Sequence, residues 1–188
     1  MLQNILSYAH NLLEESISPG ELVVDATCGN GNDTLFLAEL VGKEGKVLAF
    51  DIQERAIKAT EELLQQHNQT KNVTLIQDSH AFLSKYLKKD DEVSGAIFNL
   101  GYLPKSDKSI ITKSTSTLEA LELLLGRLKK NGLIIFVVYH GHNGGKEEKN
   151  ALLQYVTQLE QKEYHVLQYN FINQKNDPPF IIAIEKRK

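Results

Sequence analysis

Residues 23–34, which read Val-Val-Asp-Ala-Thr-Cys-Gly-Asn-Gly-Asn-Asp-Thr, combine the side chains and spacing in this sequence that most clearly indicate chemistry. A short apolar run ends in an acid, Asp25, and a turn with Gly29 and Gly31 follows before a helical pattern opens near Asp33. A strand, a glycine-rich turn and a helix N-terminus form the site at which open α/β sheets bind nucleotide-like ligands. We expect the glycines to let the main chain approach such a ligand closely.

The same turn argues against a dinucleotide as the ligand. A pyrophosphate-binding turn needs a third glycine where this chain has Thr34, and a carboxylate at Asp25 would repel a diphosphate and attract a cation. S-adenosylmethionine has no phosphate and carries an ammonium and a sulfonium group. Asp51, twenty residues after Gly31, ends the next apolar run, where a carboxylate can accept hydrogen bonds from both ribose hydroxyls. The sequence therefore predicts S-adenosylmethionine as cofactor; an ordinary strand-turn-helix with two strand-end acids is the alternative.

The third predicted strand is followed by Gln77-Asp78-Ser79-His80. Asp78 could bond the adenine amino group, although Asp78 or Ser79 could equally cap a helix. At this point the chain resembles the class I S-adenosylmethionine-dependent methyltransferases. The resemblance implies a set of cofactor-binding residues: Asp25, Cys28, Gly29, Asn30, Gly31, Asn32, Asp33, Asp51, Ile52, Asp78, Ser79, His80 and Asn99. Cys28, the only cysteine, is expected to pack rather than to act as the nucleophile that a C5-pyrimidine methylase needs.

The fourth predicted strand ends in Phe98-Asn99-Leu100-Gly101-Tyr102-Leu103-Pro104. Amino-group methyltransferases often carry Asn or Asp, two prolines and an aromatic residue here, and this chain has Leu100-Gly101 between Asn99 and Tyr102. The resemblance implies that Asn99 orients the target amine and that Tyr102 stacks on the base. We expect substrate contacts from four more residues: Gly101, Leu103, Pro104 and Lys105. The alternative is an Asn-Leu-Gly turn in which Tyr102 only packs.

Two later loops also carry candidate residues. His140-Gly141-His142 follows the fifth predicted strand, and either imidazole could position the substrate or accept a proton. Two histidines at this spacing are weak grounds for a metal, so no metal site is predicted. The alternatives to a catalytic role are that His140 packs in the protein and that His142 is exposed to solvent. We expect Gly144 and Gly145 of this loop to approach the substrate closely. In the loop between the last two predicted strands, the amides of Asn173 and Asn176 could read base edges; the alternative is a plain turn.

Taken together, these motifs resemble one bacterial family, long described as rRNA methylases and now assigned as tRNA 5-(aminomethyl)-2-thiouridine methyltransferases. The resemblance implies methylation of the aminomethyl nitrogen at the tRNA wobble uridine, a homodimer, and an anticodon stem-loop as the RNA partner. An rRNA N-methyltransferase would use the same motifs. A small-molecule amine methyltransferase, a silent S-adenosylmethionine-binding subunit and a dinucleotide oxidoreductase remain weaker alternatives.

Length, charge and cysteine content indicate the class of protein in which these residues lie. The chain has 188 residues, a formal net charge of −3 and one cysteine. It lacks the start of a signal peptide and any apolar run of about 18 residues that could cross a membrane. We therefore expect a cytoplasmic protein without an internal disulfide or a membrane contact, and a charge that does not itself indicate nucleic-acid binding.

Strand and helix patterns alternate along the chain. Apolar runs predict strands near 22–26, 47–51, 73–77, 94–99, 133–139, 164–172 and 180–185, and helical spacing predicts helices near 2–15, 33–41, 54–67, 79–87, 116–130 and 147–162. Alternation implies a mainly parallel sheet with helices on both faces. Only residues 173–179 separate the last two strands, so the last strand should pair antiparallel. The prediction is one α/β domain over 1–188, a Rossmann-like class I methyltransferase with an N-terminal helix (1–16) packed on it.

Overall fold

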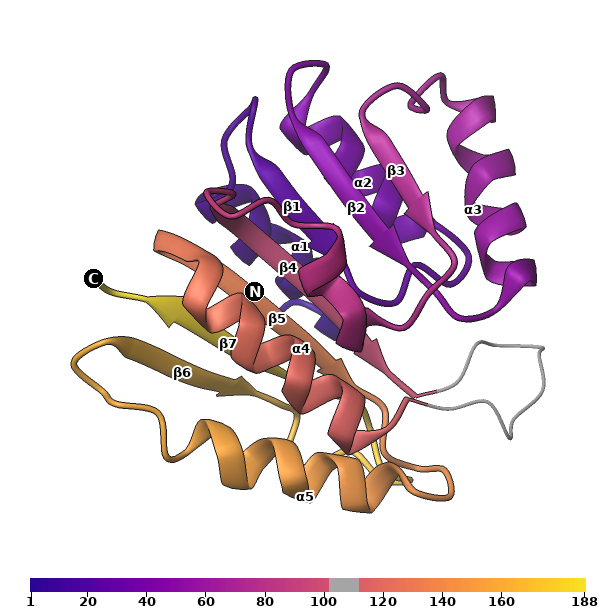
Figure 1. The fold of residues 1–188 in the computed structure, drawn as a ribbon. Coiled ribbons are helices and arrows are strands. Elements are labelled where there is room, and N and C mark those ends of the chain that lie inside the picture. The colour runs from indigo at the N-terminus through magenta and orange to yellow at the C-terminus, as the bar shows by residue number, and fades with distance from the viewer. Residues whose placement is uncertain (102–111) are drawn as a thin grey trace.

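The computed structural model describes residues 1–101 and 112–188, and these contain a seven-stranded sheet of order β3-β2-β1-β4-β5-β7-β6 (Figure 1). The strands are β1 (Leu22–Asp25), β2 (Lys46–Phe50), β3 (Val73–Ile76), β4 (Val93–Leu100), β5 (Leu128–Val138), β6 (Tyr164–Tyr169) and β7 (Phe180–Lys186). β7 runs antiparallel to β5 and β6, and the other neighbouring strands pair parallel. The predicted α/β class and the antiparallel last strand are therefore confirmed.

Helices cover both faces of this sheet. One face carries α1 (Ile5–Ser16), α2 (Asn32–Val41) and α3 (Glu54–Gln66). The other face carries the short 3-10 helix η1 (His80–Lys85), α4 (Ser114–Arg127) and α5 (Gly145–Val156). No helix within the described ranges is long and apolar enough to cross a membrane.

Successive residues of the central strands pack alternately on the two faces of the sheet. Ile135 packs in the cluster with α1, α2 and α3, and its neighbour Phe136 packs in the cluster with α4 and α5. Phe98 of β4 stacks on Phe136 with ring centroids 4.5 Å apart. Because both faces of the central strands are buried, their sequences are continuous apolar runs rather than alternating ones. This is why the sequence reveals the strands so clearly.

The N-terminal helix α1 lies against the strands that carry the site. Asn4 caps it by accepting a hydrogen bond from the main-chain N–H of Ser7 at 2.9 Å. Its buried side chains are spaced by four residues (Ile5, Ala9 and Leu13) and join the core beside β4 and β5.

Several predicted elements differ from the observed ones. The helix expected over 79–87 is the shorter 3-10 helix η1, which is kinked at Phe82. The helix expected over 116–130 ends at Arg127, because Leu128 turns into extended conformation and pairs with Val93 as the first residue of β5. The helix expected to reach 162 ends at Val156, and the strand expected to reach 172 ends at Tyr169. These ends depend on tertiary pairing, which the local pattern does not encode.

The strand order places the site. β2 and β3 lie on one side of β1, and β4 and β5 lie on the other, so the strand order reverses between β1 and β4 (Figure 1). Ligands of open α/β sheets bind beyond the carboxyl ends of the strands at such a point. Asp25 ends β1 and Asn99 lies next to the end of β4, so both predicted site residues lie at this edge.

Candidate active site

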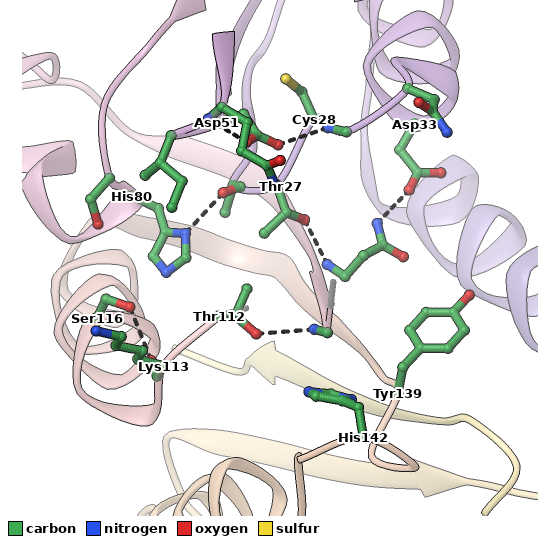
Figure 2. A pocket seen from close by; sticks show the side chains of 18 of the residues that line it. Thr27, Cys28, Asp33, Asp51, His80, Thr112, Lys113, Ser116, Tyr139 and His142 are labelled. Atoms are coloured by element: carbon green, nitrogen blue, oxygen red, sulfur yellow. Dashed lines mark hydrogen bonds between the residues drawn. The ribbon is translucent and has the colours of Figure 1, made fainter. Parts of the chain in front are cut away.

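A cavity of about 940 Å³ opens at this edge of the sheet (Figure 2). Its walls come from the glycine-rich turn, from the segments after β2 and β3, and from the ends of β4 and β5. The structure thus brings together fourteen of the predicted site residues: Cys28, Gly29, Asn30, Asn32, Asp33, Asp51, Ile52, Asp78, Ser79, His80, Asn99, Gly101, His140 and His142. Tyr102, Leu103, Pro104 and Lys105 lie outside the described residues.

The glycine-rich turn packs against Thr60 of α3. Gly31 has a positive φ of 86°, and a Cβ built on it would lie 2.8 Å from the Cα of Thr60. Thr60 also donates a hydrogen bond from its hydroxyl to the carbonyl of Gly29 at 3.3 Å. Gly31 does not line the cavity, so its lack of a side chain serves the packing of the turn on α3 rather than a ligand contact.

Asp51 connects the turn to the start of α3. One carboxylate oxygen accepts from the N–H of Gly29 at 3.1 Å, and the other accepts from the N–H of Gln53 at 2.9 Å. Burial raises the pKa of Asp51 above its ordinary value. Each oxygen retains a further lone pair, so the carboxylate can also accept bonds from two hydroxyls of a ligand in the cavity.

Asp25 lies deeper than the sequence suggested. Its carboxylate is fully buried and accepts from the Thr34 hydroxyl at 2.6 Å and from the N–H of Thr27 at 3.2 Å. Burial foremost, with the nearby charge of Asp33, raises the pKa of Asp25 to about 7. The structure does not bring Asp25 to the cavity wall, so it can influence a bound cation through its charge but not through contact.

The segment after β3 supplies another wall. Ser79 caps η1 by accepting from the N–H of Ala81 at 3.2 Å, so Ser79, rather than Asp78, is the helix cap. Asp78 accepts from the Tyr86 hydroxyl at 2.9 Å, and this bond is the largest cause that holds the pKa of Asp78 below its usual range. Asp78 thus remains a charged acceptor at the cavity.

His80 lines the cavity with its ring. Its Nδ1 donates to the carbonyl of Ala26 at 2.9 Å, so Nε2 carries the lone pair. Nε2 is buried and has no hydrogen-bond partner within residues 1–101 and 112–188. Burial lowers the pKa of His80, which keeps the ring neutral. Nε2 is thus an unpaired acceptor enclosed by protein atoms beside the cavity.

Asn99 is anchored through both its main chain and its side chain. Its N–H donates to the Thr27 hydroxyl at 2.7 Å, and its Nδ2 donates to Asp33 at 2.7 Å. Asp33 also accepts from Nε2 of His10 at 2.6 Å. Neither Thr27 nor His10 is predicted as a site residue, since nothing in their local sequence pattern links them to Asn99 or Asp33.

A second missed group surrounds Gly101. Thr112 donates its N–H to the Gly101 carbonyl at 3.0 Å, and its hydroxyl accepts from the Gly101 N–H at 3.0 Å. The same hydroxyl donates to the buried carboxylate of Glu148 at 2.6 Å, and Thr117 donates to the other oxygen of Glu148 at 2.8 Å. Glu148 therefore ties the end of β4 to α4 and α5.

The two histidines after β5, His140 and His142, both line the cavity together with Tyr139. Figure 2 shows His142 and Tyr139 on this wall. His140 is 8% exposed, and its Nδ1 lies 3.8 Å from a carboxylate oxygen of Asp177. Burial, and then the charge of Lys149, lower the pKa of His140, so the ring is neutral at pH 7 and can accept a proton. Asp177 was not predicted and belongs to the loop before β7.

Four predicted substrate residues do not reach the cavity. Gly144 precedes α5 with a φ of 82°, and a Cβ on Gly145 would lie 2.9 Å from the Cα of His140. Both glycines are thus needed for the packing of their own loop. Asn173 and Asn176 are exposed in the loop between β6 and β7. Among the described residues no group of three or more His, Cys, Asp or Glu is arranged to hold a metal ion.

Comparison with known proteins assigns the family. Residues 47–185 match the family described as "Putative rRNA methylase". The chain belongs to this family. A solved structure from Clostridium thermocellum, described as a "putative rRNA-methylase", is 43% identical, with a TM-score of 0.95 and 99% of each chain covered. A Streptococcus mutans methyltransferase, solved in complex with SAH, is 42% identical, with a TM-score of 0.90 and 99% of each chain covered.

A curated relative is also similar over most of its length. The "tRNA (mnm(5)s(2)U34)-methyltransferase, chloroplastic" of Arabidopsis thaliana is 38% identical over 186 residues, which are 95% of this chain and 68% of that protein. The family and these relatives confirm the predicted class: the chain is an S-adenosylmethionine-dependent methyltransferase of class I fold.

Proposed function

We propose that this family member methylates the aminomethyl nitrogen of 5-aminomethyl-2-thiouridine at the wobble position of tRNA. The observation that carries the proposal is the similarity of nearly the whole chain to a plant methyltransferase whose name specifies the methylated product, mnm5s2U, at position 34 of tRNA. The anticodon stem-loop is the RNA element that presents the nucleoside, and it is the proposed partner.

The chemistry of the cavity fits the cofactor. Asp51 is placed to hold the ribose hydroxyls, Ile52 offers an exposed apolar surface to the adenine, and the Asp78 carboxylate can accept from the adenine amino group. Gly29 and Asp33 lie at the end suited to the methionine part, where carboxylate charge favours its ammonium. When bound, S-adenosylmethionine supplies a methyl group on a sulfonium, ready for in-line displacement.

The acceptor side of the cavity suits an amine. The attacking nitrogen must be unprotonated, and the Oδ1 atom of Asn99 can accept one of its N–H bonds and orient its lone pair. As the nitrogen gains the methyl group it must lose a proton, which the neutral ring of His140 can accept. His142, on the same wall, is the other candidate for this proton.

Charge at the cavity rim supports a polyanionic acceptor. Lys113 lines the cavity, and Lys146 and Lys149 are close enough to His140 for their charges to lower its pKa. Such cations can neutralise phosphates next to the reacting base. Lys146 and Lys149 lie near His140, next to the opposite charge of Asp177, and supply local positive charge at this wall of the cavity.

In vitro methyl transfer with nucleoside mass spectrometry tests this proposal. The purified protein and S-adenosylmethionine are given tRNA from a strain that lacks the gene, a synthetic anticodon stem-loop with the 5-aminomethyl-2-thiouridine, or rRNA from the same strain. We expect 5-methylaminomethyl-2-thiouridine from both tRNA substrates and no transfer to rRNA. Transfer to rRNA alone would replace the proposal with the rRNA alternative, and transfer to neither would favour a non-catalytic role.

The proposed assembly is a homodimer, and the proposed location is the cytoplasm. Sedimentation equilibrium of the purified protein tests the first, with a mass near twice 21.2 kDa as the expected result. A monomer that methylates tRNA would contradict the dimer without affecting the proposed reaction.

A further inference from the structure

The N-terminal helix α1 contributes two side chains to the active-site region, one turn apart. Leu6 lines the cavity, and His10 points toward the same wall through its bond to Asp33. The His10 ring lies flat on Phe36 of α2, with centroids 3.9 Å apart and planes 3° apart. This stack fixes the plane of the imidazole, so that Nε2 is held toward Asp33.

Asp33 joins His10 to Asn99. One of its oxygens accepts from His10 at 2.6 Å, and the other accepts from Nδ2 of Asn99 at 2.7 Å. The Asp33 side chain is 14% exposed, so water competes little for these bonds. The carboxylate is therefore held at both oxygens, one from α1 and one from β4.

These bonds determine which way the Asn99 amide faces. The two ends of an amide have nearly the same shape but opposite hydrogen-bonding roles. A carboxylate only accepts, so Asp33 selects the orientation in which Nδ2 faces it. The Oδ1 atom is then the end of the amide that does not bond Asp33, and it can accept from an N–H donor in the cavity.

We propose that His10 is a positioning residue for methyl transfer: it holds Asp33 so that Asp33 orients the Asn99 amide with its oxygen toward the acceptor amine. The inference rests on the proposed function in one respect, that the acceptor is an amine. His10 touches neither reactant, so its effect should be on turnover rather than on cofactor affinity.

Two substitutions separate the hydrogen bond of His10 from its packing. His10→Phe retains a ring on Phe36 and removes the donor, and His10→Gln retains an N–H donor without the ring. Glu14→Gln, at an exposed position one turn further along α1, is the matched control. The readouts are kcat on the tRNA acceptor, Kd for S-adenosylmethionine, the melting temperature, and hydrogen exchange of the Asn99 side-chain amide by NMR.

We expect His10→Phe to lower kcat about tenfold or more, the loss typical of a misoriented positioning group, with the cofactor Kd within about twofold of wild type. His10→Gln should recover most of that loss, and Glu14→Gln should match wild type. Asn99 amide exchange should become faster in His10→Phe and return toward wild type in His10→Gln.

Unchanged kcat and unchanged Asn99 exchange in His10→Phe would overturn the inference. So would a loss of kcat that follows the melting temperature and is not recovered by His10→Gln. If the wild-type protein fails to methylate the tRNA, the proposed function fails, and the NMR exchange alone decides whether His10 positions Asn99.

Discussion

Three carboxyl groups near the glycine-rich turn have different surroundings, which decide what each can do. Asp25 is fully buried beneath the turn, whereas Asp33 and Asp51 line the cavity. Asp51 accepts two main-chain bonds, and Asp33 accepts two side-chain bonds. Asp51 is thus suited to ligand hydroxyls, Asp33 to orienting Asn99, and Asp25 to a long-range effect of charge.

The raised pKa of Asp25 predicts a pH-dependent cost in stability. The pKa is about 7 in the folded protein against an ordinary value of 3.8, so the folded state binds more protons between these values. Stability should therefore fall as pH rises from about 4 to about 7. Asp25→Asn should remove this loss, and its advantage over wild type should grow across the window by up to about 4 kcal/mol.

Urea unfolding of the ligand-free proteins at intervals from pH 4.5 to 7.5 measures this effect. Asn at position 25 retains an acceptor for the Thr34 hydroxyl, so the comparison isolates the charge. A constant difference between the two proteins across the series would show that Asp25 has an ordinary pKa.

Asp51 is predicted to govern cofactor affinity. Asp51→Asn retains the size of the side chain but replaces one acceptor oxygen with a donor, so it should weaken both the turn and the ribose contact. We expect the Kd for S-adenosylmethionine to rise about tenfold to a hundredfold, as for a charged hydrogen bond, measured by calorimetry. Asp90→Asn, at an exposed position, is the control; an equal Kd for both variants would place the ribose elsewhere.

At the scale of elements, the sequence predicts the strands and the residues directly after them. β1, β2 and β4 are buried on both faces, so their apolar runs and the polar residues that end them are visible without a structure. Asp51 and Asn99 were found for this reason. The glycines of the turn were found as well, although Gly31 serves packing rather than ligand contact.

The supporting residues were not predictable in this way, because their partners are distant in sequence. His10 and Asp33 are 23 positions apart, Thr112 and Glu148 are 36 apart, and Thr27 bonds a residue 72 positions away. A local pattern carries no sign of such pairs. Glu148 in particular reads as an ordinary acid in the first turn of a helix, yet it is 3% exposed.

Glu148 is predicted to stabilise the joint between β4, α4 and α5. Glu148→Ala removes the acceptor of two hydroxyls, one of them on the buried Thr117, so it should destabilise the protein by about 2–4 kcal/mol. Glu148→Gln should lose less because one acceptor remains. Glu147→Ala, an exposed change in the same helical turn, controls for the helix dipole. Chemical denaturation measures all three; equal losses for Glu147→Ala and Glu148→Ala would refute the role.

On the scale of the whole molecule, charge is distributed unevenly around one cavity. The net charge is −3, and four acids (Asp25, Asp33, Asp51 and Asp78) lie in or below the turn and strand-end walls of the cavity. Lys146 and Lys149 lie near His140, beside the carboxylate of Asp177. The proposed reaction would use the acidic walls for the cationic methyl donor and these lysines for the RNA, a division that the net charge alone would not suggest.

The most direct test of the central claim is nucleoside mass spectrometry of tRNA from cells that lack this gene. The strain is complemented with the wild-type gene or with Asn99→Ala. We expect 5-aminomethyl-2-thiouridine to accumulate in the deletion, the wild-type gene to restore 5-methylaminomethyl-2-thiouridine, and Asn99→Ala to restore little of it. An unchanged tRNA profile in the deletion would rule out the proposed reaction.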